Sequence, residues 1–293
     1  MNTFARQLQF FGVLTVTLLG ASSASASITL YSNGFETDTD GWLSAPTRVA
    51  SLTNGITSAA GSFHAQTAAN QGDYTAWGGY NYGAGNAVPT VFKEYTTSID
   101  IYLDVEGGWA NRTRFDFDSA INNSTGSFQR DYIFNAAFHN DATGPGAGTN
   151  RFVISVGNNS QAGSAYAKDP NHDPIAISTS GWYTFQNHFY DNGGFLAVDM
   201  SILDSSNNLV NDWSSTDNPG VSYPRAGEAI STVGGNRYGW FDVNEFSFLA
   251  IDNAKLTVEG NSPVPEPMSL VVWSALATTI GGAVCWRQYK LAG

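Results

Sequence analysis

The chain has 293 residues, and its 13 Lys and Arg against 25 Asp and Glu give a formal net charge of −12. This acidic balance argues against nucleic acid as a partner, because phosphate binding needs a basic face. The single cysteine, Cys285, excludes an intramolecular disulfide, so the core or a bound metal must stabilise the fold.

Residues 1–26 have the pattern of a secretory signal peptide. Arg6 supplies the positive charge, residues 8–20 are largely apolar, and Ala24-Ser25-Ala26 offers a small-residue cleavage site. A core helix is the alternative, but the stretch has no polar face and no helix cap follows it. We therefore expect export and a mature chain that begins near Ser27.

Residues 27–261 are predicted to form a single ectodomain. No Pro/Ser-rich linker, charge run or fixed-period repeat divides them. Without the two ends, 10 basic and 24 acidic residues remain, a formal charge of −14. Divalent cations, neutral glycans and polycations stay open as partners of such a body, whereas nucleic acid does not.

The body reads as β-strands joined by polar turns. Residues 99–106 alternate apolar and polar side chains, which is the period-two signature of a half-buried strand. The same alternation recurs around Phe115, Phe152 and Val198, and Gly/Asn/Asp/Ser stretches separate these runs. Many short antiparallel strands over this length predict an all-β, two-sheet antiparallel sandwich or jelly roll. Its core should include Ile99, Ile101, Leu103, Val105 and Phe248.

Aromatic residues gather in the Gly-rich stretch 72–85, and Trp109 and Trp240 lie beside turn signals. Planar rings on loops can stack on sugar faces while amide-rich loops supply hydrogen bonds. The alternative is that these rings belong to the core, since Trp and Tyr are favoured in strands. The candidate ligand-binding residues are Trp77, Tyr80, Tyr82 and Trp109, with Tyr74 in the same stretch.

Catalytic signatures are few. The four histidines His64, His139, His172 and His188 show no metal-ligand spacing, and no Gly-x-Ser-x-Gly sequence is present. Asp100, Asp104 and Glu106 share one predicted outward face and could be argued as glycosidase acids. A solvated acidic face explains them as well. We therefore expect a protein that is not an enzyme.

Asp252 interrupts the predicted apolar face of the last strand. A carboxylate that faces a core needs a partner, and calcium, with Glu36 from the first strand and backbone carbonyls, would supply one. Alternatively, Asp252-Asn253 marks a β-bulge, or Asp252 accepts backbone hydrogen bonds in a dry site. Glu36 and Asp252 are thus candidate ligands of a structural Ca²⁺.

Short motifs carry a resemblance to a known fold family. Asn33-Gly34-Phe35-Glu36 with Gly41-Trp42, Gly181-Trp182-Tyr183-Thr184-Phe185, and residues 250–256 resemble strands of jelly-roll carbohydrate-binding modules and their concanavalin-like relatives. The resemblance implies that a structural calcium bridges the first and last strands through Glu36 and Asp252. A sugar ligand is a weaker implication, because the fold hosts many functions.

The C-terminal segment 262–293 reads as a sorting tail. Val264-Pro265-Glu266-Pro267 precedes an uncharged apolar run, 268–286, and then Arg287 and Lys290. As a helix the run would be about 28 Å long, enough to span a bilayer, with its basic end cytoplasmic. This order of elements resembles the PEP-CTERM proteins of Gram-negative bacteria. The resemblance implies that a membrane-embedded exosortase cuts near the triplet and passes the body to the cell surface; an uncut anchor is the alternative.

Three functions remain open from the sequence. The first is an exported, surface-sorted, non-catalytic β-sandwich associated with the extracellular matrix or exopolysaccharide. The second is a dedicated carbohydrate-binding module, and the third is a secreted polysaccharide hydrolase. Exposed coplanar aromatics would favour the second, and two carboxyl groups facing each other across a cleft would favour the third.

Overall fold

The computed structural model describes residues 25–43, 46–69, 74–75, 89–158, 173–214 and 228–263. The chain divides into two units, of which Ser27–Glu259 holds the fold. Within the described ranges, no helix has the length and apolar character needed to cross a membrane. Residues 1–24 of the predicted signal peptide, and the tail from Val264 onward, lie outside the described residues.

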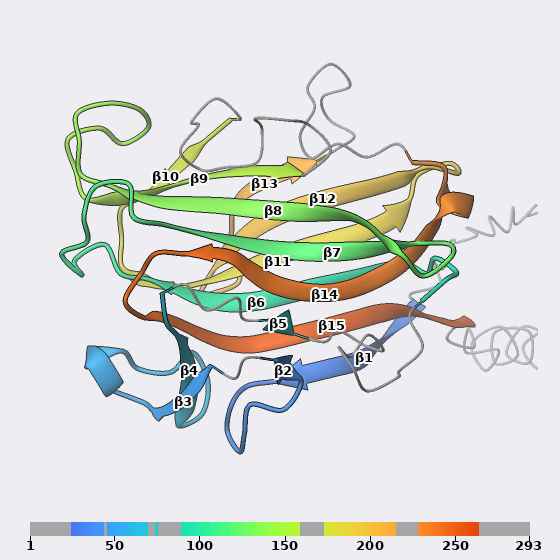
Figure 1. Cartoon of the computed structure of the whole chain (residues 1–293), viewed down its shortest axis with the longest axis horizontal. Coiled ribbons are helices and arrows are strands. Elements are labelled where there is room, and N and C mark those ends of the chain that lie inside the picture. Colours follow the sequence, from blue (N-terminus) through green and yellow to red (C-terminus); the bar gives the residue numbers. More distant parts are fainter. Residues whose placement is uncertain are drawn as a thin grey trace, which may run out of the picture. The chain divides into compact units, whose positions relative to one another are not determined.

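Eight of the described strands form one sheet, sheet A, in the order β13-β12-β11-β6-β15-β4-β3, with β1 also paired to β15 (Figure 1). Neighbouring strands along this order, from β13 to β3, pair antiparallel. The strands are β1 (Ser25–Asn33), β3 (Thr47–Ala50), β4 (Phe63–Thr67), β6 (Tyr95–Leu103), β11 (Gly181–Asp191), β12 (Leu196–Asp204), β13 (Leu209–Ser214) and β15 (Leu249–Pro263).

Seven of the described strands form sheet B, in the order β10-β9-β8-β7-β14-β5-β2, again antiparallel. Two short 3₁₀ turns, η1 (Thr53–Gly55) and η2 (Ile230–Thr232), are the helical elements of the described ranges. The strands are β2 (Trp42–Leu43), β5 (Tyr74–Thr75), β7 (Arg114–Asn123), β8 (Phe128–His139), β9 (Arg151–Asn158), β10 (Ile175–Ile177) and β14 (Val233–Asn244).

The two sheets pack face to face through aromatic side chains. Phe185 of sheet A lies edge-on to Phe134 and Phe115 of sheet B, with ring centroids 5.2 and 5.9 Å apart. Tyr132 of sheet B meets Phe189 of sheet A in the same way at 5.3 Å. Burying such rings removes large apolar areas from water, and edge-to-face contacts add to that stabilisation. The predicted two-sheet antiparallel sandwich is confirmed.

Alternation along β6 decides which side chains reach this core. Ile99, Ile101 and Leu103 are fully buried, and Val105, just past the strand, is 2% exposed. The residues between them face away from sheet B, as the period of two requires. Four of the predicted core positions are therefore confirmed, whereas Phe248 is only half-buried.

A β-bulge in β15 corrects the predicted face of Asp252. The pairing of β15 with β6 shifts register between Asp252 and Lys255, and Asn253 has a positive φ of 48°. Ile251 and Leu256 both belong to the core, so the inserted residue switches faces between them. Asp252 pairs with Asp100 and lies with it on the outer face of sheet A, although it is fully buried.

Candidate functional site: a groove on the outer face of sheet A

Strand register gathers polar and aromatic side chains on the outer face of sheet A. Trp182 pairs with Tyr102, and Thr184 pairs with Asp100, between β11 and β6. Directly opposed residues of an antiparallel pair project to the same face, and the intervening Ile101 projects into the core. The alternation that builds the core therefore also builds this outer row.

A groove of about 400 Å³ lies over this row. Sheet A contributes Asp100, Trp182 and Thr184 to it. Its other described lining comes from the turn before β4, from the hairpin between β12 and β13, and from the bulge in β15: Thr57, Ser58, Ala59, Asp204, Ser205, Asn207 and Asn253. Its volume lies within the range of small-ligand sites, and its lining combines one large aromatic ring with many hydrogen-bonding groups.

Trp182 is held rigidly at the groove. Its indole Nε1 donates to the carbonyl of Thr57 at 2.6 Å. Its ring is edge-on to Tyr102 at 5.4 Å and to His64 at 5.9 Å. His64 is fully buried, which lowers its pKa, and its Nδ1 lies 3.1 Å from the hydroxyl of Ser58. The half-buried ring is thus a preorganised surface whose orientation does not depend on a ligand.

Two aspartates supply the charge of the groove. Asp100 accepts the hydroxyl of Thr184 at 2.5 Å on one oxygen and the amide of Asn253 at 2.7 Å on the other. Asp204 closes the β12–β13 hairpin by accepting from Asn208, through its side chain at 3.0 Å and its backbone N–H at 2.9 Å. Those hydrogen bonds lower the pKa of Asp204, so its carboxylate stays ionised over a wide pH range.

Asp252 and Glu36 fix the turn that borders the groove. Asp252 Oδ2 accepts the backbone N–H groups of Ala59 at 3.1 Å and Ala60 at 3.3 Å, and Oδ1 accepts that of Asn253 at 2.9 Å. Burial nevertheless raises the pKa of Asp252 to about 7. Glu36 accepts the N–H groups of Ser62 at 3.0 and 3.1 Å and of Phe63 at 3.1 Å.

These bonds bear on the calcium prediction. Asp252 and Glu36 each receive three N–H contacts. For Asp252, this is the dry hydrogen-bonded site that stands in the sequence analysis as an alternative to calcium. In the described part of the chain, no three His, Cys, Asp or Glu side chains cluster to hold a metal. Each carboxylate keeps a lone pair that no N–H contact uses, so calcium ligation by Glu36 and Asp252 stays a prediction.

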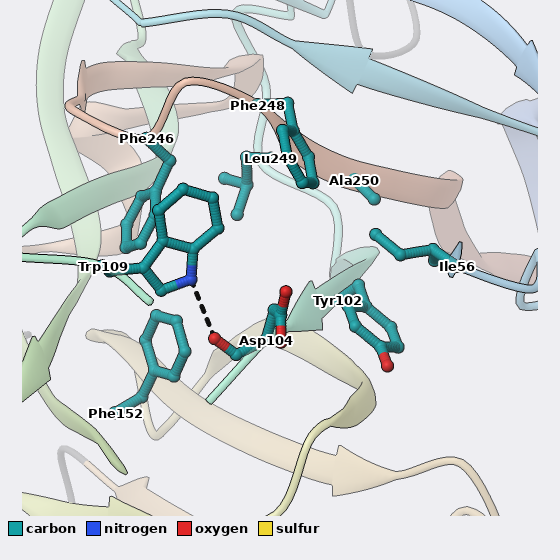
Figure 2. Close-up of a pocket in the computed structure, with 9 residues that line it drawn as sticks. All are labelled: Ile56, Tyr102, Asp104, Trp109, Phe152, Phe246, Phe248, Leu249 and Ala250. Carbon is teal, nitrogen blue, oxygen red and sulfur yellow. Dashed lines mark hydrogen bonds between the residues drawn. The ribbon is translucent and has the colours of Figure 1, made fainter. Parts of the chain in front are cut away.

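Of the aromatic residues predicted to bind ligand, the one that the structure describes with its side chain, Trp109, does not line this groove. Figure 2 shows Trp109 among Phe152, Phe246 and Phe248, around a pocket of about 10 Å³, room for a single water. Its ring is edge-on to Phe246 at 5.1 Å, and its Nε1 donates to the carbonyl of Asp104 at 2.8 Å. Trp109 thus packs against the core. Trp77, Tyr80 and Tyr82 lie outside the described residues, and their ligand binding remains a prediction.

Sheet B carries a second group of acids that sequence reasoning missed. Asp116, Asp118 and Asp131 lie on its outer face and are at most 5% exposed. Burial raises the pKa of Asp116 and of Asp131 to about 7 each, and the pKa of Asp118 well above its usual range. Asp116 and Asp118 alternate with Phe115 and Phe117, so the sequence pattern predicts that they point outward. The pattern does not indicate that this outward face is buried.

The acidic residues that follow the outward face of β6 do not all lie on a solvated face, which is one of the two interpretations of the sequence. Asp100 is half-buried and hydrogen-bonded on both oxygens, whereas Glu106 is exposed. Sequence reasoning missed the groove of which Asp100 is part. The one feature of the sequence that could have indicated the groove is Trp182, but its motif, residues 181–185, is interpreted from the sequence only as a strand.

Comparison with known proteins adds little to this geometry. No family model matches the chain, and no curated protein matches it at a significant level. Among solved structures, the crystal structure of the botulinum neurotoxin serotype G binding domain is similar over 85% of this chain, with 10% identity and a TM-score of 0.34. The match spans about half of that structure, 51% of its chain. Similarity at this level carries no argument about function, which therefore depends on the groove.

Proposed function

We propose that the protein is an exported, non-catalytic β-sandwich that binds a glycan of the extracellular matrix or exopolysaccharide in the groove on sheet A. The observation that carries the proposal is Trp182, whose half-buried ring is fixed beside a polar groove of about 400 Å³. A rigid aromatic face stacks on the apolar face of a pyranose, and carboxylate, amide and hydroxyl groups nearby bond its hydroxyls.

The export part of the proposal depends on the two chain ends. The pattern of residues 1–26 supports secretion, and Val264-Pro265-Glu266-Pro267 followed by an apolar run and Arg287 supports a sorting tail. The proposed partner of the tail is a membrane-embedded, exosortase-like protease. After cutting, the body would reside at the cell surface or in the matrix around a Gram-negative cell, where glycans are abundant.

A glycan array followed by calorimetry on the full-length protein in detergent tests the binding. Trp182→Ala should weaken binding of the best glycan by about tenfold, equivalent to about 1.4 kcal/mol. Trp109→Phe is the matched control, because Trp109 packs against the core away from the groove. If Trp109→Phe reduced binding and Trp182→Ala did not, the site would lie elsewhere. Failure of a correctly folded protein to bind any glycan would refute the proposal.

Polysaccharide hydrolysis is a second candidate, which the acids of sheet B favour. Asp118 and Asp131 project from neighbouring strands to one face, and burial raises the pKa of both. A raised pKa lets a carboxyl donate a proton near neutral pH, which is one of the properties that a glycosidase acid needs. Release of reducing ends from polysaccharides by the wild type, lost in Asp118→Asn while Trp182-dependent binding persists, would establish this function.

A further inference from the structure

The charge of the groove on sheet A is entirely negative in its described lining. Asp100 and Asp204 both line it, and no Lys, Arg or His is among the lining residues that the structure describes. Asp252 lies directly opposite Asp100 in the strand register, but it is fully buried and does not line the groove. A bound anion would therefore meet repulsion with no compensating base.

Within the part of the chain that the structure describes, no cation neutralises either lining carboxylate. Both oxygens of Asp100 accept from neutral groups, the hydroxyl of Thr184 and the amide of Asn253. Asp204 likewise accepts from the backbone and amide of Asn208 and from the backbone of Ser206. Among the described residues neither aspartate forms an ion pair. These hydrogen bonds orient the two carboxylates through neutral donors, which leaves the carboxylates able to attract a positive ligand.

Trp182 supplies the second element of a cation site. Its indole N–H is already used by the carbonyl of Thr57, and neither Tyr102 nor His64 is stacked parallel to the indole, because both pairs are T-shaped. Because an aromatic face carries negative potential, it attracts an ammonium group that lies within a few ångströms of the ring. The same face stacks on a pyranose, so one ligand can use both interactions.

We infer that the groove selects glycans that carry primary ammonium groups, such as de-N-acetylated glucosamine polymers, over neutral and anionic glycans. This inference rests on the proposed glycan-binding function and names its ligand class. The amine of a hexosamine would meet Asp100 or Asp204 while its ring lies against Trp182. An N-acetyl group removes the charge, and a uronic acid reverses it.

Calorimetry on the full-length protein with three oligosaccharides of equal length tests the selection: fully de-N-acetylated chito-oligosaccharide, its N-acetylated counterpart and oligogalacturonate. At mildly acidic pH, where the sugar amine is protonated, the amine-bearing oligomer should bind at least tenfold more tightly than the acetylated one. Its affinity should fall as salt is added, because ions screen exposed charges. Oligogalacturonate should not bind measurably.

Asp100→Asn and Asp204→Asn should each weaken binding of the amine-bearing oligomer more than binding of the acetylated one, so that the preference for the amine falls several-fold. Asp191→Asn is the matched control, because Asp191 closes the other hairpin of β12, by accepting from Gly194 at 2.6 Å, and does not line the groove. It changes net charge equally and should preserve the preference. Equal binding of the amine-bearing and acetylated oligomers, or tighter binding of oligogalacturonate, would overturn the inference and leave glycan binding intact. Absence of binding to all three would overturn the inference alone if another glycan on the array still binds, and would overturn glycan binding as well if none does.

Discussion

The carboxylate of Asp252 in the last strand accepts the backbone N–H of Ala59, 193 positions earlier in the chain, at 3.1 Å. Ala59 lines the groove, as does Asn253, whose own backbone N–H bonds the other oxygen of Asp252. The buried side chain of Asp252 thus connects the last strand, β15, to the turn that borders the groove. The groove and the stability of the fold are coupled through this contact.

Replacing Asp252 should disturb both properties. Asp252→Ala leaves the N–H groups of Ala59 and Ala60 without their acceptor. Because neither residue is fully buried, the cost per group lies at or below that of a buried unpaired group, which is about 1–3 kcal/mol. For a body of this size each kcal/mol lowers the melting temperature by about 2–4 °C. Differential scanning calorimetry measures that loss, and weaker glycan binding should accompany it. Asp252→Asn keeps an acceptor oxygen and should lose less. Equal melting temperatures for wild type and Asp252→Ala would contradict this role.

Calcium binding by Glu36 and Asp252 predicts a response to chelation. A cation that binds only the folded form adds about 2.7 kcal/mol when its free concentration is a hundred times its dissociation constant. EGTA should then lower the melting temperature of the wild type by several degrees, and Glu36→Gln or Asp252→Asn should abolish the response. A melting curve that EGTA leaves unchanged would mean that N–H donors alone satisfy both carboxylates.

The buried acids predict that the folded protein is more stable in mild acid than at neutral pH. Burial raises the pKa above the ordinary value of 3.8 for Asp116, Asp118, Asp131 and Asp252. Between about pH 4 and about pH 7 the folded state then binds more protons than the unfolded state, so the free energy of unfolding falls as pH rises. Urea titrations across this range should show that fall.

Two buried histidines have the opposite effect on how the free energy of unfolding depends on pH. Burial lowers the pKa of His64 and His139, so they contribute stability above about pH 6.5 that is lost in acid. Four acids against two histidines leave the acid trend dominant. Asp118→Asn removes one buried ionisable group and should raise stability at neutral pH while flattening the profile. A wild-type protein whose stability rises steadily from pH 4 to pH 7 would contradict the prediction.

The sorting tail predicts a mass loss. If an exosortase-like protease cuts near Pro265-Glu266-Pro267, protein extracted from the cell surface should lack residues 268–293. Intact-mass spectrometry measures this directly, and a strain without the protease should retain the tail. Finding the complete tail on surface-extracted wild-type protein would leave simple membrane anchoring as its role.

Local pattern was sufficient for the architecture. A period of two in residues 99–106 predicts that Ile99, Ile101 and Leu103 share one apolar face, because successive side chains of a strand alternate faces, and this face is buried in the core. The same rule failed at Asp252. A bulge inserts one residue and so exchanges the two faces of the strand beyond it. From the sequence, a bulge at Asp252-Asn253 is only one of several explanations for a carboxylate on an apolar face.

The charge, the lack of a disulfide and the strand alternation were set by the sequence, because each depends on composition or on neighbours two residues apart. Only the tertiary structure decided where function can reside. Residues that are distant in the chain meet in one groove because four strands pair and two turns lie beside them. They are Thr57, Asp100, Trp182, Asp204 and Asn253. The burial of Asp118 on an outward face has the same origin. Alternation states which way a side chain points, but burial depends on what packs over it.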